Sequence, residues 1–238
     1  FNSLKIFFRN VRKQKVMTLM SILGLSLGMA ITILVGLWSV QEFNYDNFHR
    51  HGDRIYRGLY NNNWEGHEYK NYTGFGPVGE TGREQIPEVE AMCRIVNVED
   101  TELSNDLRIK VDQRYYEQFR IMMTDENFFN FFTFRLKEGQ EDNVLHSMDG
   151  MVIDQSTAAL LFPGENAVGK IVSYANRDWT VSGIMEDMPA NSHIRANVIV
   201  PFWGTRINSY WGGYGGFKTY FLLRQGVDAD KIGDQLTQ

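Results

Sequence analysis

The sequence predicts an α+β protein: one N-terminal transmembrane helix, then an extracytoplasmic domain of ferredoxin-like βαβ halves. Two observations lead to this prediction. A run of 24 residues from Met17 to Val40 contains no charged side chain. The following residues, 41–238, alternate strand-like and helix-like segments in the order strand–helix–strand twice over, with hairpins added and no low-complexity stretch.

The uncharged run is long enough to cross a membrane. A helix of this length measures about 36 Å, and the hydrocarbon core of a bilayer is about 30 Å thick. A secretory signal peptide is the main alternative, but its apolar region covers about 7–15 residues and ends at a small-x-small cleavage site. The residues from Trp38 onward offer no such site. We therefore predict an uncleaved transmembrane helix over residues 17–40.

Charge is distributed unevenly along the chain. Residues 1–16 hold five basic residues and no acidic one: Lys5, Arg9, Arg12, Lys13 and Lys15. Of 24 basic residues in all, 19 remain for the rest of the chain, against 29 acidic ones, a net charge of −10. Positive flanks stay in the cytoplasm, so the N-terminus is predicted inside and residues 41–238 outside. The acidic body argues against nucleic acid as a partner, because attraction to phosphate dominates that affinity.

The basic segment also has an apolar face. Leu4, Phe7, Phe8 and Val11 follow the i, i+3, i+4, i+7 spacing of one side of a helix, opposite the basic side chains. This pattern predicts a cytoplasmic amphipathic helix over residues 1–16 that lies in the interface of the lipid bilayer. The alternative is a basic flank that only sets the orientation of the span.

Small residues mark one face of the predicted span. Gly24 and Gly28 form a G-x-x-x-G motif, extended by Ser21 and Ala30. Small side chains let two helix backbones approach closely. We therefore expect Ser21, Gly24 and Gly28 to pack against another membrane helix.

The elements of the outer part follow from periodicity and turn residues. Helices are predicted at 77–86, 155–162 and from 228 onward, and a short aromatic helix at 125–134 that begins with Asp125 as N-cap and runs into a strand. Strands are predicted at 53–60, 89–98, 107–111, 118–123, 150–154, 196–202 and 218–224, with a hairpin over 170–187 that turns near Asn176.

One stretch resembles the start of a nucleotide-binding P-loop, because Gly164 is followed after four residues by Gly169 and Lys170. A P-loop needs a strand before the first glycine, a helix starting at the lysine, and a Ser or Thr next to it for magnesium. Here a predicted helix comes first, Lys170 opens a strand, and Ile171 cannot ligate a metal. We interpret Gly164 and Gly169 as structural turn residues and expect no nucleotide cofactor.

A histidine-rich stretch is a second candidate site. Asp46, His49, His51 and Asp53 are residue types that can bind a divalent ion. We favour a polar loop instead, because no further cluster completes a site. Cys93 is the only cysteine, which excludes an intrachain disulfide and a cysteine metal cluster. The sequence therefore predicts no metal site.

Three further stretches are interpreted without chemistry. Ser192 and His193 are adjacent, and adjacent residues rarely form a nucleophile–base pair, so we predict a turn between strands. The phenylalanines between residues 128 and 134 are predicted to pack in the core. Residues 210–216, an aromatic and glycine-rich stretch, are predicted to form a surface loop, with contact to a partner or ligand as the alternative. No catalytic residue is predicted.

Several stretches together resemble the N-terminal part of bacterial ABC-transporter permeases of the MacB/FtsX type. They are FFRNVRKQKVMTLMSILGLSLGMA, YDNFHRHGDRIYRG, DENFFNFFTFRLKEG, MVIDQSTAALLFPGENAVGKIV and WTVSGIMEDMPANSHI. The resemblance runs from about residue 4 to the end. It implies that residues 41–238 are a MacB-like core domain, with an inserted subdomain at roughly 90–125. Three further membrane helices of the family are absent here and the chain begins at Phe1, so we expect a fragment of a longer permease.

The resemblance also implies a function. Such a permease is a non-catalytic subunit of the bacterial inner membrane that works as a dimer. A cytoplasmic ABC ATPase hydrolyses ATP, and the permease transmits the movement to its periplasmic domain (mechanotransmission). Family members export macrolides or peptides, release lipoproteins, or control cell-wall hydrolases, and a periplasmic adaptor or a lipoprotein is a possible partner. The alternative is a single-pass signal-anchored receptor with a ligand-binding outer domain.

Overall fold

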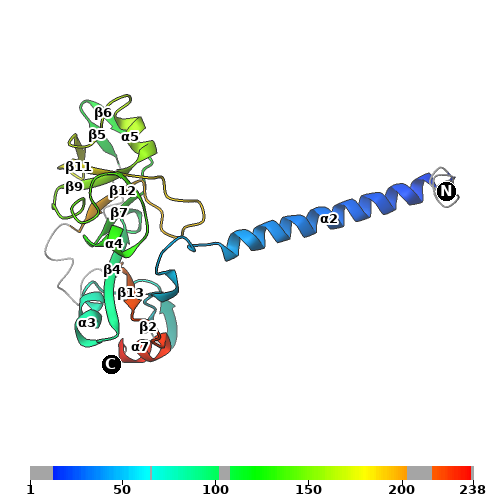
Figure 1. Ribbon diagram of the computed structural model, residues 1–238, viewed down its shortest axis with the longest axis horizontal. Coiled ribbons are helices and arrows are strands. Elements are labelled where there is room, and N and C mark those ends of the chain that lie inside the picture. The colour runs from blue at the N-terminus through cyan, green and yellow to red at the C-terminus, as the bar shows by residue number, and fades with distance from the viewer. Residues whose placement is uncertain (1–12, 65, 102–107, 203–215, 237–238) are drawn as a thin grey trace. The chain divides into compact units, whose positions relative to one another are not determined.

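The computed structural model describes residues 13–64, 66–101, 108–202 and 216–236 (Figure 1). The chain divides into two compact units, Phe1–Tyr45 and Asp46–Gln238. In the first, helix α2 (Lys15–Phe43) contains the whole of the predicted span and has no buried residue. Its 29 residues make it long and apolar enough to cross a membrane. The predicted N-terminal apolar helix is confirmed, and Lys5, Arg9 and Arg12 lie outside the described residues.

The second unit is built around a large mixed sheet. Ten of its 11 strands form a continuous path, in which each strand pairs with the next. In spatial order they are β1 (Ile55–Arg57), β13 (Lys218–Leu223), β4 (Val89–Asn97), β7 (Ile121–Thr124), β12 (Val198–Pro201), β9 (Gly150–Asp154), β11 (Arg177–Met185), β10 (Ile171–Tyr174), β5 (Ile109–Val111) and β6 (Arg114–Tyr116). The remaining strand, β8 (Leu136–Glu138), pairs with β11.

Among the described residues, four α-helices accompany this sheet: α3 (Pro77–Gln85), α4 (Phe128–Phe131), α5 (Gln155–Leu161) and α7 (Ala229–Leu236). Strand β9 runs parallel to β11, with α5 between them along the chain, and β7 runs parallel to β12. The other described pairings are antiparallel. Figure 1 shows β5, β6 and α5 at one end of the domain and α3 and α7 at the other. The predicted α+β class is confirmed.

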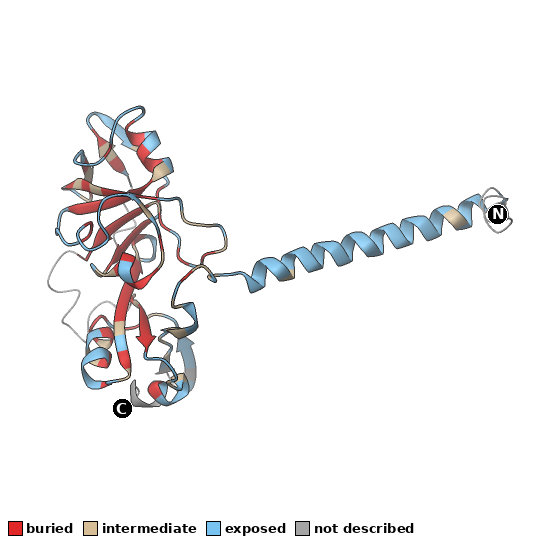
Figure 2. Ribbon diagram, viewed as in Figure 1, coloured by how far each residue is buried: buried red, intermediate tan, exposed pale blue. Residues whose placement is uncertain are grey.

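The central strands are buried, as the red ribbon in Figure 2 shows, and their side chains join apolar clusters on both faces of the sheet. In β12, Val198 and Val200 join one apolar cluster, while Ile199 between them joins a second one. This division follows from the alternation of side chains along a strand. The second cluster also contains the aromatic residues for which core packing was predicted: Phe128, Phe129, Phe131, Phe132 and Phe134.

The hairpin between β10 and β11 turns through Ala175 and Asn176, as predicted. Both residues have positive φ, 51° and 55°, and Tyr174 pairs with Arg177 across the turn. A two-residue loop with two positive φ values is the turn that matches the twist of a hairpin. The sequence interpretation missed a second hairpin, β2 (Tyr60–Trp64) and β3 (His67–Asn71), which forms a separate sheet. Its polar sequence lacks the apolar alternation that marks a half-buried strand.

One cap prediction is wrong. Helix α4 begins at Phe128 with Asn127 as its N-cap residue, not Asp125. The carboxylate of Asp125 accepts hydrogen bonds from Arg94 instead. Within the expected insertion at roughly 90–125, β4 and β7 lie in the middle of the sheet, and β5 and β6 form a hairpin at its end. The insertion itself stays an expectation.

Candidate functional site: the polar anchor of the first loop

The second unit begins with a loop, residues 46–54, which we call the first loop. Asp46, its first residue, follows Phe43, the last residue of α2, after only two residues. Asp46 adopts a positive φ of 57°, a conformation that aspartate tolerates better than most residues. Its backbone N–H donates to the carbonyl of Asn191 at 2.9 Å. The backbone therefore already ties the start of the domain to the segment before His193.

The side chain of Asp46 joins a chain of hydrogen bonds. One carboxylate oxygen of Asp46 lies 2.6 Å from Nδ1 of His193, and the other accepts the His193 backbone N–H at 3.0 Å. The second ring nitrogen, Nε2 of His193, lies 2.8 Å from the hydroxyl of Tyr220 in β13. Three segments that are distant in sequence meet in this Asp46–His193–Tyr220 chain, which we call the polar anchor.

The polar anchor resembles a catalytic triad in order, but its electrostatics are those of a structural contact. Tyr220 is 3% exposed, and burial raises the pKa of its hydroxyl to about 12. A nucleophile must be accessible to its substrate and is activated by an adjacent base, a lowered pKa or a metal ion. Ser192, the neighbour of His193, is completely buried, and its hydroxyl accepts the N–H of Ile194 at 3.2 Å. Neither hydroxyl is placed to attack a substrate.

His49 makes a second attachment of the first loop. Its Nδ1 accepts the backbone N–H of Thr133 at 3.1 Å, and the N–H of Arg50 donates to the Thr133 hydroxyl at 2.8 Å. Burial lowers the pKa of His49 to about 4, against an opposing effect of the Asp46 charge. The ring is therefore neutral at pH 7. Both attachments fix the loop before β1 begins.

The four residues of the histidine-rich stretch do not converge. Asp46 contacts His193, His49 contacts Thr133, and Nδ1 of His51 lies 3.0 Å from the guanidinium of Arg54. Asp53 is exposed. Among the described residues, no group of three or more His, Cys, Asp or Glu side chains could hold a metal ion. The sequence interpretation did not pair Asp46 with His193, which lies 147 residues away.

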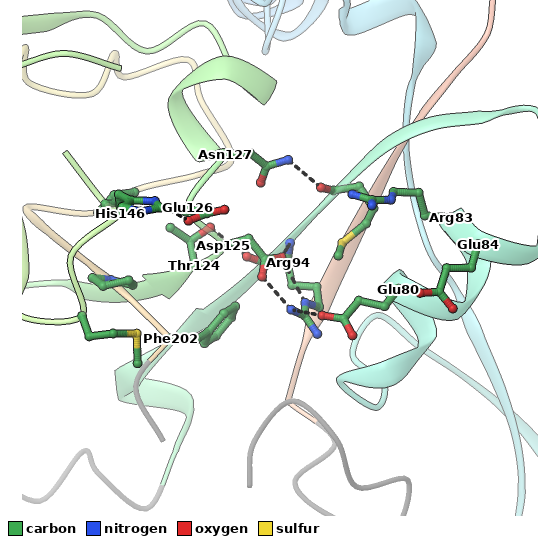
Figure 3. Close-up of a pocket in the computed structure, with 14 residues that line it drawn as sticks. Glu80, Arg83, Glu84, Arg94, Thr124, Asp125, Glu126, Asn127, His146 and Phe202 are labelled. Atoms are coloured by element: carbon green, nitrogen blue, oxygen red, sulfur yellow. Dashed lines mark hydrogen bonds and ion pairs between the residues drawn. The ribbon is translucent and has the colours of Figure 1, made fainter. Parts of the chain in front are cut away.

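A pocket of about 420 Å³ lies elsewhere in the domain, between α3, β4 and the segment that joins β7 to α4 (Figure 3). Figure 3 shows Glu80, Arg83 and Glu84 of α3 on one side, and Glu126 and His146 on the other. Glu126 and Nδ1 of His146 are 3.0 Å apart. The lining thus carries charges of both signs and already pairs most of them.

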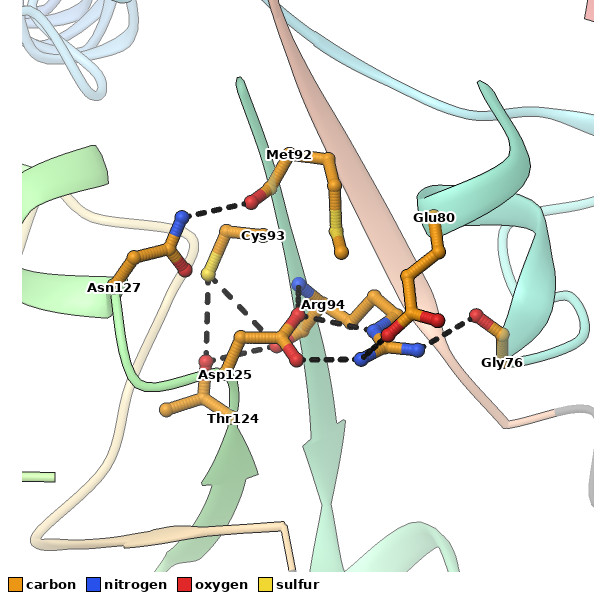
Figure 4. Close-up of polar contacts among 8 residues, drawn as sticks. All are labelled: Gly76, Glu80, Met92, Cys93, Arg94, Thr124, Asp125 and Asn127. Atoms are coloured by element: carbon orange, nitrogen blue, oxygen red, sulfur yellow. Dashed lines mark hydrogen bonds and ion pairs between the residues drawn. The ribbon is translucent and has the colours of Figure 1, made fainter. Parts of the chain in front are cut away.

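Arg94 is one of the residues that line this pocket, and Figure 4 shows its polar contacts. Its guanidinium donates to both carboxylate oxygens of Asp125, at 3.0 and 2.6 Å, and to Glu80 at 3.1 Å. It also donates to the Gly76 carbonyl at 2.9 Å. Burial opposes the charged form, but Asp125 and Glu80 outweigh it and raise the pKa of Arg94. Arg94 therefore connects β4, α3 and the end of β7 as a permanent cation.

The glycines of the P-loop-like stretch lie between α5 and β10. Gly164 and Gly169 have φ values of 79° and 83°, which glycine adopts without steric cost. The amine of Lys170 lies 2.7 Å from the carboxylate of Glu165 and is not surrounded by backbone N–H groups of a helix start. Ile171 opens β10 and is exposed. The surroundings differ from those that a nucleotide phosphate requires.

The predicted packing residues lie on α2. Cβ atoms added at Gly24 or Gly28 would meet no atom within 4 Å, so this face is open within the chain. The Ser21 hydroxyl donates to the carbonyl of Met17 at 2.9 Å, one turn earlier. Packing of this face on another helix stays a prediction. Of the interfacial basic residues, Lys13 and Lys15 are described and exposed.

Together, these features define a sheet-rich domain preceded by an apolar helix that is long enough to cross a membrane. The chain belongs to the family of MacB-like periplasmic core domains, whose sequence model matches residues 18–238. It is thus a MacB-like periplasmic domain of an ABC-type permease, and members of this family are components of transporters. No curated protein matches the chain to a significant degree.

Three solved structures share the fold. A domain of a protein assigned as a permease from Porphyromonas gingivalis is 25% identical, with a TM-score of 0.68, over 79% of this chain and 81% of that one. The periplasmic region of MacB from Actinobacillus actinomycetemcomitans is 19% identical (TM-score 0.55, 78% and 82% covered). The extracellular domain of the noncanonic ABC-type transporter YknZ from Gram-positive bacteria is 12% identical (TM-score 0.50, 68% and 80% covered).

Proposed function

We propose that this chain is part of a permease subunit that couples ATP hydrolysis by a cytoplasmic ABC ATPase to movement of its periplasmic domain. The family match supports the class of protein, and the polar anchor supports the coupling role. Only Asn44 and Tyr45 separate the end of α2 from Asp46. A displacement of the helix end is thereby passed along the chain to Asp46, and from Asp46 to His193 and β13.

The attachment points explain why such a displacement would move the domain as a body. Tyr220 lies in β13, whose neighbours in the sheet are β1 and β4. Thr133, which holds His49, follows α4 and lies in sequence between Phe132 and Phe134, two buried members of the second apolar cluster. Close-packed interiors transmit strain because they have little free volume. Both attachments of the first loop therefore act on the rigid part of the domain.

Orientation and partners complete the proposal. Lys13 and Lys15 precede the apolar part of α2, so the N-terminus is cytoplasmic and the domain periplasmic, in the inner membrane. The open Gly24 and Gly28 face fits a second membrane helix, in a permease dimer or in the same subunit. The domain is a non-catalytic partner of the ATPase, and an adaptor or a lipoprotein is its candidate periplasmic partner. Export, lipoprotein release and cell-wall hydrolase control remain the candidate roles.

The experiment places one reactive thiol on the domain. Leu160 is 54% exposed and Cys93 is buried, so Leu160→Cys can be spin-labelled selectively. In nanodiscs that contain the native protein and its partner ATPase, the distance between the two labels of a dimer is measured with ADP and with ATP. We expect a nucleotide-dependent change that is lost in Asp46→Ala, while ATP hydrolysis continues.

Lys170→Ala is the matched control, because its exposed pair with Glu165 contributes little to stability. This variant should keep both the nucleotide-dependent distance change and the ATPase activity. A label distance that ignores nucleotide in the unmodified protein would contradict the proposal. Failure of any ATPase to associate with the protein would favour the single-pass receptor.

A further inference from the structure

His49 of the first loop occupies a position that suits only a neutral ring. Its side chain is 8% exposed, and its ring centroid lies 4.1 Å from Phe48, 5.3 Å from Phe132 and 5.2 Å from Phe134. Nδ1 accepts the N–H of Thr133, so the proton of the neutral ring is on Nε2. Nε2 is buried without a hydrogen-bond partner among the described residues.

Protonation of the His49 ring would disrupt its hydrogen bond from the backbone N–H of Thr133. The added proton must go to Nδ1, because Nε2 already carries one. Nδ1 would then point an N–H at the N–H of Thr133, and the attachment would become a contact between two donors. The positive charge would also be buried, and among the described residues no carboxylate is hydrogen-bonded to the ring. The geometry thus makes the first loop sensitive to acid.

The charged and titratable groups around His49 act in opposite directions. Asp46, on the same loop, favours the protonated ring, and His193, from the segment before β12, opposes it. Tyr220 of β13 is hydrogen-bonded to His193 and stays protonated. The segment 132–134 that packs against the ring carries only Thr133 and two phenylalanines. Burial is the largest influence and opposes the charge.

We propose that the first loop is an acid-released contact: proton uptake at Nδ1 of His49 breaks the hydrogen bond from Thr133 and frees the loop from segment 132–134. Release would remove one of the two attachments of the first loop in acid and leave only the polar anchor to transmit movement, a consequence that rests on the proposed coupling function. The release itself does not depend on that function. A domain outside the cytoplasm meets the pH of its surroundings, which makes such regulation useful there.

The two pKa values of His49 set the size of the effect. The attached ring has a pKa of about 4, and a released ring has the ordinary value of 6.5. Because the attached value is the lower one, attachment is fully favoured above pH 6.5 and weakens as the pH falls towards 4. Between pH 7.5 and 4 the equilibrium constant for attachment decreases by about 150-fold, and the limit well below pH 4 is about 300-fold.

The test compares the full chain in nanodiscs with a His49→Asn variant. Asparagine places an oxygen near the position of Nδ1, so it keeps an acceptor for Thr133 and removes the titration. Hydrogen exchange of the Thr133 and Arg50 amides is measured from pH 7.5 to 4 in both proteins. At each pH, the exchange rate of an amide in the unmodified protein is divided by its rate in His49→Asn, and this ratio cancels the intrinsic dependence of exchange on pH. We expect the ratio to rise by at least tenfold at low pH, with faster exchange in the unmodified protein.

A second measurement keeps the inference open to refutation if His49→Asn folds poorly. The five histidines are labelled with ¹⁵N and titrated by NMR, with His146→Asn, an exposed site, as control. His49 should titrate well below 6.5 in the attached state. An ordinary titration of His49, or equal exchange in the variant and the unmodified protein, overturns the inference. The coupling experiment is to be done at pH 7.5, where His49 is neutral, so its failure is separate from either result.

Discussion

The guanidinium of Arg94 and the carboxylate of Asp125 form a bidentate pair in the interior of the domain, with N–O distances of 3.0 and 2.6 Å. The same carboxylate accepts the backbone N–H of Arg94 at 2.8 Å. The side chains are 2% and 15% exposed. A residue expected to cap a helix instead neutralises a buried cation, and this pair joins β4 to the end of β7.

Asp125→Ala should destabilise the domain strongly, by about 3 to 5 kcal/mol, because it leaves the buried charge of Arg94 without its main partner. Chemical denaturation measures the free energy of unfolding. Glu90→Ala is the matched control: its pair with Arg54, at 2.9 Å, has side chains that are 20% and 50% exposed, and should contribute under about 1 kcal/mol. Equal decreases in the free energy of unfolding of both variants would show that the Arg94–Asp125 pair stabilises the domain no more than the exposed pair does.

The polar anchor should appear as energetic coupling between distant residues. A double-mutant cycle of Asp46→Ala and His193→Ala is expected to give an interaction free energy of about 1 kcal/mol or more, since both side chains are about one-third exposed or less. Glu126 and His146 form a similar pair at 3.0 Å, but both are mostly exposed, and their cycle should give a value near zero. Additive effects of Asp46→Ala and His193→Ala would exclude the anchor.

The free energy of unfolding should depend on pH through His49. Its pKa is about 4 in the folded state and 6.5 in the unfolded state, so the unfolded chain takes up the proton first as the pH falls. Stability from this group is complete above pH 6.5 and declines by about 2 to 3 kcal/mol by pH 4.5. Urea unfolding at pH 7.5 and 4.5 measures the difference. His49→Asn should show a smaller decline, and an identical decline would assign it to other groups.

The hairpin turn offers a stabilising substitution. Ala175 adopts a φ of 51°, where alanine is strained and asparagine is tolerated. Ala175→Asn should raise the free energy of unfolding by about 0.5 to 1 kcal/mol. Ala175→Val should lower it by more than about 1 kcal/mol, because a β-branched residue fits this conformation worst. Thermal unfolding of the two variants gives the signs, and a lower melting temperature for Ala175→Asn would contradict the expectation.

The proposed packing of the Gly24 and Gly28 face of α2 is tested by introducing larger side chains there. Replacement of both Gly24 and Gly28 by leucine should abolish assembly with other membrane helices, because close backbone approach becomes impossible. The domain should stay folded, since neither glycine has a neighbour within 4 Å. Cross-linking in membranes measures assembly, and protease resistance measures folding. Replacement of Leu23 and Leu27 by isoleucine is the control, and normal assembly of the double leucine variant would exclude the packing role.

The sequence by itself determined the features that depend on neighbouring residues. The apolar run of α2, the helix of α5 and the hairpin at Asn176 each follow from composition, periodicity or turn chemistry within a few residues. The wrong cap at Asp125 shows the limit of that local reasoning. A carboxylate before a helix can cap it, and no local pattern reveals that a buried guanidinium from another strand will bind it instead.

Only the tertiary structure decided which polar residues meet. Asp46 and His193 are 147 residues apart, and Arg94 and Asp125 are 31 apart. The polar β2–β3 hairpin likewise had no periodic signal. Periodicity reports which face of an element is buried, because burial is a property of each segment. Pairing of charges and hydrogen bonds depends on strand order, which the packing of the whole sheet sets.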